Sequence, residues 1–363
     1  MKRKKDIMLN QALLDKVRSV VPYTPGDQPQ GKVIKLNTNE NPYPPAPKVA
    51  ERLQNFTIDQ LRLYPDPTMA DFVRTIANYH NVLDSQVFIG VGSDDVIAQA
   101  FMTYFSSGKK ILFPDVTYSF YEVWAELFHI PYERPSLDPD FNMIIPDYQG
   151  DLGGIIFPNP NAPTGVYEPL EKVEELLQAN PNTVVIVDEA YIDFAGEGAS
   201  AVSLLDKYPQ LIVVRTYSKS RSMAGMRIGY ALGHPELIKR LLDVKYAYNS
   251  YTLSQLSFLC GITSIDEEDY FQDQVNKIVQ TREWFEEELK KLGFEYLPSR
   301  TNFIFTKHPT IPGADLMKQL KERNIYVRHF QKPRISDYLR ISIGTPEEMG
   351  ILKDALKEII SLR

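Results

Sequence analysis

Short apolar runs alternate with helical stretches through the middle of the chain, and this alternation constrains the fold more than any other feature. The apolar runs occupy residues 87–91, 110–113, 154–157, 183–187 and 211–214. The helical stretches between them occupy residues 94–105, 118–128 and 169–178. Such runs, separated by helices, are typical of parallel strands that are buried on both faces. We therefore predict an α/β fold with a mainly parallel sheet.

The end of the chain follows a different pattern. Residues 266–292 have the character of one long charged helix, and residues 302–305 and 338–343 resemble strands with a helix at 315–323 between them. A final helix is expected to start at Thr345, because Pro346 suits its first turn and Glu348 completes a capping box. This α+β pattern predicts a second, smaller domain.

The length of the chain agrees with two domains. At roughly 100–200 residues per domain, a chain of 363 residues has room for two. We predict an N-terminal arm with part of the small domain at 1–46, a large α/β domain at 47–260 and a small α+β domain at 261–363.

Composition disfavours several classes of protein. A net charge of −7 gives no general attraction to nucleic acid or to an anionic membrane. The basic run Lys2–Lys5 precedes an apolar stretch that polar residues interrupt, which argues against a signal peptide, and no apolar window is long enough to span a membrane. The single cysteine, Cys260, excludes an intramolecular disulfide and is expected in the core. We expect a cytoplasmic protein.

The histidines offer no metal site. None of the five is spaced from another histidine or from Cys260 as zinc ligands are, so we expect no bound metal.

Lys219 follows the apolar run at 211–214 in the sequence Thr216-Tyr217-Ser218-Lys219. A lysine at the carboxyl end of a buried parallel strand faces the crevice in which α/β proteins bind ligands. Its amine can form a Schiff base with an aldehyde cofactor such as pyridoxal 5′-phosphate (PLP). A lone loop lysine is ordinarily just solvent-exposed, so the assignment depends on the residues that accompany it.

Two other strand ends carry side chains that suit such a cofactor. Asp188 follows the run at 183–187, where a carboxylate can pair with a protonated pyridine nitrogen, and Tyr191 can hydrogen-bond a ring hydroxyl. The proline-rich turn at 158–165 holds Asn161, whose amide can donate to the same hydroxyl. Each of these residues is also compatible with an ordinary loop.

A phosphate site is expected where the run at 87–91 ends. The sequence Gly90-Val91-Gly92-Ser93-Asp94 leads into a helix, and backbone N–H groups at a helix N-terminus bind phosphate. Asp95 occupies the position where a dinucleotide fingerprint needs glycine or alanine, which disfavours an NAD-dependent oxidoreductase. Arg227, eight residues beyond Lys219, adds a guanidinium that suits a phosphate dianion.

The order of these features is more specific than any one of them. Phosphate cup, Asn-Pro turn, Asp-x-x-Tyr and Ser-Lys with a following arginine occur together, and with them the chain resembles the fold-type I PLP-dependent aminotransferases over essentially its whole length. Within that group it resembles the histidinol-phosphate aminotransferases, through residues 22–26 (PYTPG), 36–42 (LNTNENP), 63–67 (LYPDP) and 338–345 (YLRISIGT).

The resemblance implies a role for each residue around PLP. Lys219 would hold the cofactor as a Schiff base and later move the proton between substrate and cofactor. Asp188 would pair with the pyridine nitrogen, Tyr191 and Asn161 would bond the ring hydroxyl, and Tyr118 would stack on the ring. The residues implied around the cofactor phosphate are Gly92, Ser93, Asp94, Ser218 and Arg227. One departure concerns Asn161, because many relatives carry asparagine one place later, where this chain has Ala162.

The resemblance also implies a substrate and a second subunit. Tyr64 would reach the neighbouring subunit's cofactor phosphate, so a homodimer is expected. The implied substrate contacts are Tyr23, Asn39, Tyr64, Arg328 and Arg340. Arg328 and Arg340 would hold an acidic group, and the implied reaction is amino transfer between L-histidinol phosphate and 2-oxoglutarate.

Alternatives remain on the same scaffold. An aromatic amino-acid transaminase or a phosphothreonine decarboxylase would share most of these residues. A non-catalytic regulator with an aminotransferase-like domain would need a DNA-binding module, for which the residues before Val33 are too few and too rich in proline.

Overall fold

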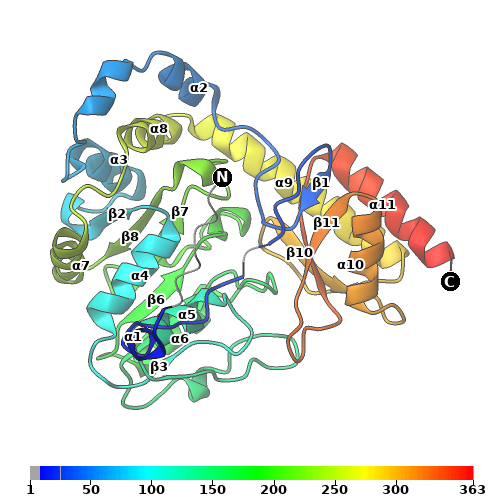
Figure 1. Ribbon diagram of the computed structural model, residues 1–363, viewed down its shortest axis with the longest axis horizontal. Helices are drawn as coiled ribbons and strands as arrows, with labels where there is room; N and C mark the ends of the chain where they lie inside the picture. Colours follow the sequence, from blue (N-terminus) through cyan, green and yellow to red (C-terminus); the bar gives the residue numbers. More distant parts are fainter. Residues whose placement is uncertain (1–8, 25, 363) are drawn as a thin grey trace.

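The computed structural model describes residues 9–24 and 26–362, and two β-sheets organise these residues (Figure 1). The basic run Lys2–Lys5 lies outside the described residues. Two hydrophobic clusters pack on the larger sheet and a third on the smaller one, and the long helix α9 (Glu268–Lys291) runs from one part of the molecule to the other.

Seven strands form the larger sheet. In spatial order they are β2 (Val87–Gly90), β8 (Gly229–Gly233), β7 (Leu211–Thr216), β6 (Val185–Asp188), β5 (Gly154–Pro158), β3 (Ile111–Leu112) and β4 (Tyr132–Glu133). The pairs from β7 to β4 are all parallel, whereas β8 is antiparallel to both β2 and β7. The prediction of an α/β fold with a mainly parallel sheet is therefore confirmed.

Successive side chains of a strand point to opposite faces of the sheet, and in the larger sheet apolar side chains lie on both faces. Helices therefore cover both faces. Val185, Val187 and Val213 belong to a core that includes side chains of the helices α3, α6 and α8, whereas Ile186 and Ile212 belong to a core on the opposite face. The helices on the first face are α3 (Ala70–His80), α6 (Leu170–Ala179) and α8 (Gln255–Ile265). Those on the second are α4 (Ser93–Tyr104), α5 (Phe120–Leu127) and α7 (Pro235–Tyr248).

The smaller sheet joins the two ends of the chain. Its strands, in spatial order, are β1 (Ile34–Leu36), β11 (Ile325–His329), β12 (Leu339–Ser342), β10 (Phe303–Lys307) and β9 (Glu295–Tyr296). The helices α9, α10 (Gly313–Glu322) and α11 (Pro346–Ser361) pack on it. The predicted capping box opens α11, since the Thr345 hydroxyl accepts from the Glu348 N–H at 3.2 Å and the Glu348 carboxylate accepts from the Thr345 N–H at 2.9 Å.

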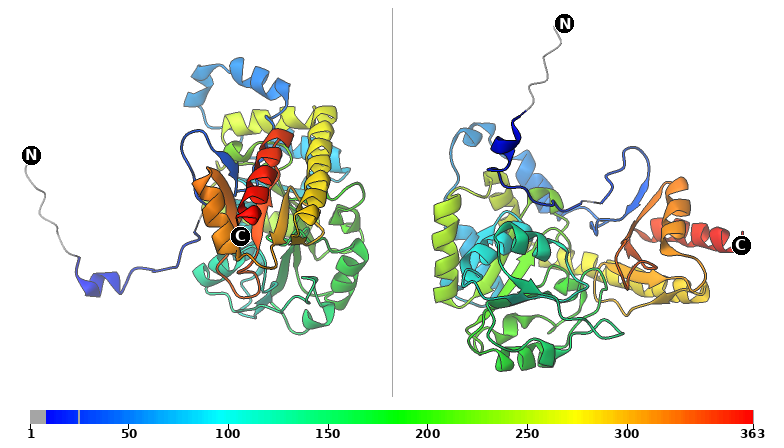
Figure 2. Two further views of the ribbon diagram at one scale, coloured as in Figure 1. Left: turned by 90° about the vertical axis from the view of Figure 1, so that its right-hand side faces the viewer. Right: turned by 60° about the horizontal axis from the view of Figure 1, so that its bottom comes forward.

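The remaining elements are short. They comprise α1 (Gln11–Leu14), α2 (Pro47–Gln54) and the 3₁₀ turns η1 (Ile58–Arg62), η2 (Asp84–Gln86), η3 (Ile145–Asp147), η4 (Ile192–Phe194), η5 (Ala201–Leu204) and η6 (Ala224–Met226). Helix α1 has no buried residue, and Figure 2 shows its segment projecting from the body of the molecule. The domain boundaries at 46/47 and 260/261 remain a proposal.

Three further expectations concern single features of the chain. Cys260 is fully buried in the core, as predicted. Over residues 9–24 and 26–362, no helix is long and apolar enough to cross a membrane. The same residues include no cluster of histidine, cysteine and carboxylate side chains that is able to bind a metal ion.

Candidate active site

A cavity lies at the carboxyl edge of the larger sheet, where the residues after β5, β6 and β7 converge. It encloses about 740 Å³ of empty space, part of which is open solvent. Eight residues predicted from the sequence line it, namely Ser93, Asp94, Tyr118, Asp188, Tyr191, Ser218, Lys219 and Arg227. The structure therefore brings together residues that are up to 134 positions apart in the chain, from Ser93 to Arg227.

Lys219 lies in the loop that follows β7. Its Nζ donates to the carbonyl oxygen of Thr38 at 3.3 Å and lies 5.7 Å from the centre of the Tyr191 ring. The Asn41 amide donates to the carbonyl oxygens of Lys219 and Ser220 at 3.1 and 3.0 Å. The N-terminal segment therefore fixes the backbone of this loop and leaves the lysine amine in the cavity.

Asp188 ends β6 and is only 4% exposed. Burial raises the pKa of its carboxyl group to about 6, although hydrogen bonds from the Tyr121 hydroxyl (2.8 Å) and the Ala190 N–H (3.2 Å) oppose this shift. A carboxylate in this position gains from a cation brought next to it, because the cation offsets the cost of burying its charge. A protonated ring nitrogen is such a cation.

The expected phosphate cup lies at the N-terminus of α4. Gly92 precedes the helix with φ of 84°, and a Cβ at this position would lie 2.6 Å from an Arg227 nitrogen, so only glycine fits here. No side chain caps the first turn of α4, which leaves its N–H groups for an anion. Because β8 is antiparallel, Arg227 lies just before the strand begins, at the same edge where β7 ends.

Polar side chains are already grouped around this cup. The Tyr118 hydroxyl donates to Asp94 at 2.9 Å, and Arg227 lies 3.4 Å from the other oxygen of Asp94. Arg227 also donates to the Ser218 hydroxyl at 3.5 Å. A phosphate here would meet a guanidinium, two serine hydroxyls and a helix N-terminus, which suits a dianion.

Tyr191 is held by a chain of hydrogen bonds from the smaller sheet. The Asn39 amide donates to the Tyr191 hydroxyl at 3.0 Å, and Ser342 on β12 holds Asn39 through its backbone N–H (2.8 Å) and its side-chain oxygen (3.0 Å). Asn39 has φ of 55°, a left-handed conformation that these bonds keep in place. Since the Tyr191 oxygen accepts from Asn39, its own hydrogen is left to donate into the cavity.

Ser342→Ala is expected to lower the free energy of unfolding by about 1–3 kcal/mol, because the buried Asn39 N–H loses its acceptor. Urea denaturation of the cofactor-free chain measures this change. Ser203→Ala is the control, since this exposed serine bonds only within its own turn and should stay within about 0.5 kcal/mol of the parent. Equal effects of the two substitutions would contradict the assigned role of Ser342.

Asn161 is one of the predicted cofactor contacts that do not line the cavity. Its amide nitrogen donates to the Val116 carbonyl at 2.9 Å and the Thr164 hydroxyl at 3.0 Å, and Ala162 lines the cavity instead. Both amide hydrogens are used, so Asn161 would have to exchange a partner to reach a ring hydroxyl. The role of Asn161 stays a prediction.

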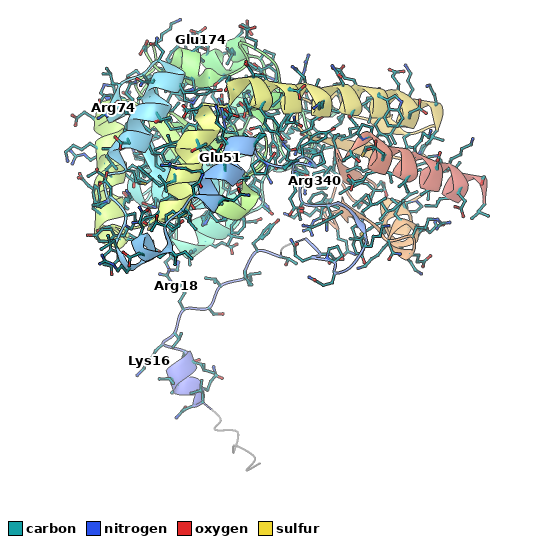
Figure 3. All side chains as sticks on the ribbon, turned by 90° about the horizontal axis from the view of Figure 1, so that it is seen from above. Lys16, Arg18, Glu51, Arg74, Glu174 and Arg340 are labelled. Carbon is teal, nitrogen blue, oxygen red and sulfur yellow. The ribbon has the colours of Figure 1, made fainter. Side chains whose placement is uncertain are left out.

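Arg328 and Arg340 form a second polar group, on the smaller sheet. They are cross-strand neighbours on β11 and β12, and Figure 3 shows Arg340 where the two parts of the molecule meet. Arg340 donates to the Asn37 carbonyl at 3.0 Å, but its buried Nε has no hydrogen-bond partner among the described residues. Burial lowers the pKa of Arg340, and the charge of Arg328 acts in the same direction.

Two predicted substrate residues lie farther out. Tyr23 stacks on Phe120 with ring centres 4.4 Å apart, beside the Tyr118 ring at 6.5 Å. Tyr64 is 79% exposed, stacks on Tyr251 and does not line the cavity of its own subunit.

Comparison with known proteins agrees with this geometry. The sequence profile of aminotransferase class I and II matches residues 31–356. The chain belongs to this family. It is therefore an aminotransferase by family, and the resemblance proposed from its motifs is confirmed.

Individual relatives in the family cover nearly the whole chain. A histidinol-phosphate aminotransferase of Clostridium botulinum (strain Okra / Type B1) is 49% identical over 345 residues, which are 95% of this chain and 97% of the relative. Histidinol-phosphate aminotransferase 1 of Methylococcus capsulatus is 49% identical over 346 residues, 95% of this chain and 96% of the relative. Among solved structures, a histidinol-phosphate aminotransferase from Sinorhizobium meliloti in complex with PLP superposes with a TM-score of 0.81 at 23% identity, and covers 92% of each chain. That last similarity concerns the fold.

Sequence reasoning missed several residues around the cavity. Tyr121, which donates to Asp188, lies three positions beyond Tyr118 and so on the same side of the helix start, which was the only signal for it. Thr38 and Glu40 also line the cavity, and the only signal for them was the motif at 36–42, whereas Thr216 belongs to the sequence Thr216–Lys219, of which only Ser218 and Lys219 were predicted as site residues.

Proposed function

We propose that this chain transfers the amino group of L-histidinol phosphate to 2-oxoglutarate, with PLP as cofactor, in L-histidine biosynthesis. The products are imidazole acetol phosphate and L-glutamate. The relatives that carry the name of this activity are 49% identical over 95% of the chain, which supports the proposal. The observation that carries it is the pair of cross-strand arginines, Arg328 and Arg340.

The residues of the cavity fit PLP. When bound, this cofactor supplies an aldehyde carbon for linkage to amines and a ring that withdraws electrons from the substrate carbon. The α4 N-terminus with Ser93, Ser218 and Arg227 would hold its phosphate, and the buried Asp188 carboxylate would pair with its ring nitrogen. Lys219 would provide the amine, and the Tyr191 hydroxyl, which accepts from Asn39, would donate to the ring oxygen.

The chain's own residues divide the work of proton transfer and orientation. The Lys219 amine is held between the Thr38 carbonyl and the Tyr191 ring. From there it can take the proton from the substrate carbon and return it to a carbon of the cofactor. Next to a bound pyridine ring, Asp188 would stay ionised and would keep the ring nitrogen protonated. Tyr191 cannot rotate away without breaking its bond from Asn39.

The arginine pair explains the choice of substrate. Two like charges directly opposite on neighbouring strands repel each other unless an anion lies between them. A phosphate dianion neutralises both charges and supplies acceptors for the unpartnered Nε of Arg340. Histidinol phosphate has this group, and the side-chain carboxylate of the glutamate product can occupy the same place.

Arg340→Met should reduce kcat/KM for histidinol phosphate by about 100-fold, as expected for hydrogen bonds to a charged group worth about 1.5–3 kcal/mol each. Its effect on histidinol, which has no phosphate, should be several-fold at most. Steady-state rates with the two amines, for the parent chain and the variant, give the coupling between arginine and phosphate. Equal losses with both amines would contradict a phosphate contact, and Arg323→Met, an arginine paired with Glu358 on the surface, is the control.

The rival activities are separated by one spectroscopic experiment. The PLP-loaded protein is mixed separately with L-histidinol phosphate, L-phenylalanine and O-phospho-L-threonine, without a keto acid. Conversion of the lysine-linked cofactor band to that of the aminated cofactor by histidinol phosphate at low concentration supports the proposal. Equal conversion by phenylalanine would favour an aromatic transaminase, and release of carbon dioxide from phosphothreonine would favour a decarboxylase.

We also propose a homodimer in which Tyr64 completes the neighbouring site. The segment around η1 exposes Ile58, Leu61, Leu63 and Tyr64, an apolar patch that a second copy would cover. Small molecules are the other expected partners, and a cytoplasmic location remains an expectation.

Co-expression of Lys219→Ala and Tyr64→Ala chains tests the shared site. Each variant alone should be impaired, whereas the mixed dimer contains one site with an intact Lys219 and an intact Tyr64 from its partner. The mixture should therefore regain up to about half of the activity per mixed dimer, as expected when residues of two chains form one site. A mixture no more active than the average of its components would contradict the proposal.

A further inference from the structure

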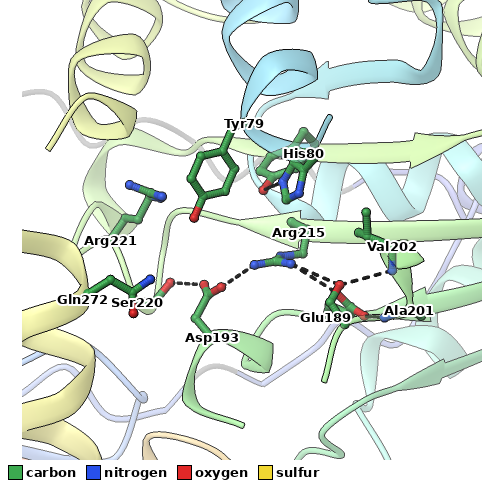
Figure 4. Close-up of polar contacts among 12 residues, drawn as sticks. Tyr79, His80, Glu189, Asp193, Ala201, Val202, Arg215, Ser220, Arg221 and Gln272 are labelled. Atoms are coloured by element: carbon green, nitrogen blue, oxygen red, sulfur yellow. Dashed lines mark hydrogen bonds and ion pairs between the residues drawn. The ribbon is translucent and has the colours of Figure 1, made fainter. Parts of the chain in front are cut away.

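Arg215 lies near the end of β7 with its guanidinium between two carboxylates (Figure 4). One nitrogen lies 3.2 Å from Glu189, and another contacts Asp193 more closely. Asp193 in turn accepts a hydrogen bond of 2.5 Å from the Ser220 hydroxyl. Arg215 is only 8% exposed, so these contacts are largely shielded from water.

Each contact of this network is close in sequence to a residue of the candidate active site. Glu189 follows Asp188, Asp193 lies two positions beyond Tyr191, and Ser220 follows Lys219. One guanidinium therefore ties the loop after β6 to the loop after β7. These two loops carry the acid, the hydroxyl and the amine proposed to hold the cofactor.

The network is separate from the cavity. None of Glu189, Asp193, Arg215 and Ser220 is among the residues that line it. Glu189 is held on its other side by the Ser200 hydroxyl at 2.7 Å and the Ala201 N–H at 2.6 Å. Arg215 therefore cannot act by touching substrate or cofactor, and any influence on the reaction must pass through the two loops.

The charges within the network favour a fixed arrangement. Burial alone would lower the pKa of Arg215, but Asp193, Tyr230 and Glu189 together outweigh burial and raise the pKa, so the guanidinium stays charged. The neighbouring His80 donates to or accepts from the Tyr230 hydroxyl at 2.8 Å, and burial together with the charges of Arg215 and Arg221 lowers its pKa to about 3. His80 therefore remains neutral and adds no competing charge.

We propose that Arg215 is a positioning residue, which sets the distance between the Lys219 amine and the Asp188–Tyr191 pair by clamping their two loops through Asp193, Glu189 and Ser220. This inference rests on the proposed PLP site. A guanidinium suits the task because its planar fork engages two acceptors in a fixed geometry, which a lysine ammonium does not.

A role in folding alone would predict a different set of effects. Removal of Arg215 would then lower stability but leave the bound cofactor's surroundings unchanged once the chain is folded. The visible absorption of the lysine-linked cofactor reports those surroundings directly, because its protonation depends on the position of the ring oxygen and of the lysine nitrogen. Its pH titration is therefore the informative measurement, and it does not depend on turnover.

Three variants separate position from charge. Arg215→Met removes both the positive charge and the planar guanidinium. Arg215→Lys keeps the charge but cannot bond two acceptors in a fixed geometry. Ser220→Ala changes no charge and removes only the hydrogen bond from Ser220 to Asp193. Lys245→Met is the matched control, since Lys245 is a buried cation, 1% exposed, whose Nζ donates to the Pro67 carbonyl at 3.2 Å, outside the two clamped loops.

The experiment measures the midpoint of the absorbance titration and the Kd for PLP in the parent and all four variants. All three network variants should shift the midpoint. The Kd should rise on the order of 10–100-fold in Arg215→Met and Arg215→Lys, the loss usual for residues that orient the direct ligands of a bound metal. In Ser220→Ala the Kd should rise about 2- to 10-fold, the loss expected for one hydrogen bond. Lys245→Met should leave both quantities unchanged.

Several results would overturn the inference. A shift in Arg215→Met alone, with Arg215→Lys and Ser220→Ala unchanged, would show an effect of charge rather than of position. Unchanged titrations in all three network variants would leave Arg215 a purely structural residue. If Arg215→Met does not fold, the other two variants decide the question in the same way. A parent protein without a band that depends on Lys219 would overturn the proposed function instead.

Discussion

Replacing Lys219 by alanine is expected to lower the rate of amino transfer by at least about 10⁴-fold, the upper range for loss of a general acid–base group. The same change removes the covalent link to PLP, so the visible band of the lysine-linked cofactor should vanish. Single-turnover absorbance with histidinol phosphate measures both effects. Partial recovery of the rate on addition of a small primary amine would show that the missing group is the proton carrier.

The matched control for this experiment is again Lys245→Met. Lys245 is as deeply buried as any lysine in the described part of the chain, and burial lowers its pKa to about 8. If any buried lysine with a lowered pKa could form the link to PLP, Lys219→Ala would retain part of the cofactor band and Lys245→Met would lose part of it. A Lys219→Ala protein that transfers amino groups at the parental rate would contradict the proposed function.

Asp188→Asn should reduce amino transfer by about 10²–10⁴-fold, since the amide cannot keep a ring nitrogen protonated and the electron-withdrawing power of the ring depends on that proton. Asparagine preserves the shape of the side chain and can still accept from Tyr121. The loss should therefore appear in kcat rather than in the amount of cofactor bound at saturation. Retention of most of the parental kcat would show that Asp188 does not serve the ring.

The same substitution should stabilise the cofactor-free chain at neutral pH. Burial raises the pKa of Asp188 from 3.8 to about 6, so the folded chain keeps a proton at pH values where the unfolded chain has lost it. The contribution of this group to the free energy of unfolding therefore falls as pH rises from about 4 to about 6, by about 3 kcal/mol in total. Asp188→Asn removes that loss.

Urea denaturation of both cofactor-free chains at pH 4.5 and pH 7.5 checks this expectation. The difference in free energy of unfolding between Asp188→Asn and the parent should be larger at the higher pH, whereas saturating PLP should favour the parent by mass action. A difference that does not change with pH would show that Asp188 titrates normally in the fold. Opposite effects on stability and on activity would identify Asp188 as a group kept for the cofactor.

Much of the site could be predicted because it lies at strand ends. Parallel strands present their carboxyl ends at one edge, so an apolar run followed by Asp188, or by Ser218 and Lys219, already places those side chains together. Local chemistry also identified the glycine at the start of α4 and the capping box of α11. Both depend on residues within a few positions of each other.

Other features depend on contacts that a single sequence does not display. Strand β8 contains two glycines in five residues, which hides its strand character, yet Gly229 is needed because a Cβ there would lie 2.3 Å from the Gly92 carbonyl carbon. The pairing of β1 with β11 joins residues almost 300 positions apart, and nothing in the sequence of either strand indicates its partner. The predicted apolar run ended at Val214, and the next residue, the buried Arg215, has its partners Glu189 and Asp193 at another strand end, where the local sequence does not show them.

The antiparallel strand β8 has a consequence for what the cavity can accept. It separates β2, which leads to the phosphate cup, from β7, which leads to Lys219, so the axes of these two strands lie two strand spacings apart, or about 10 Å. The distance between β2 and β7 could change only by the insertion or loss of a strand, since no side-chain substitution alters the spacing of hydrogen-bonded strands. The sheet therefore fixes how far apart the backbone of the phosphate cup and the backbone of Lys219 lie, and side chains such as that of Lys219 cover the remaining distance to a ligand.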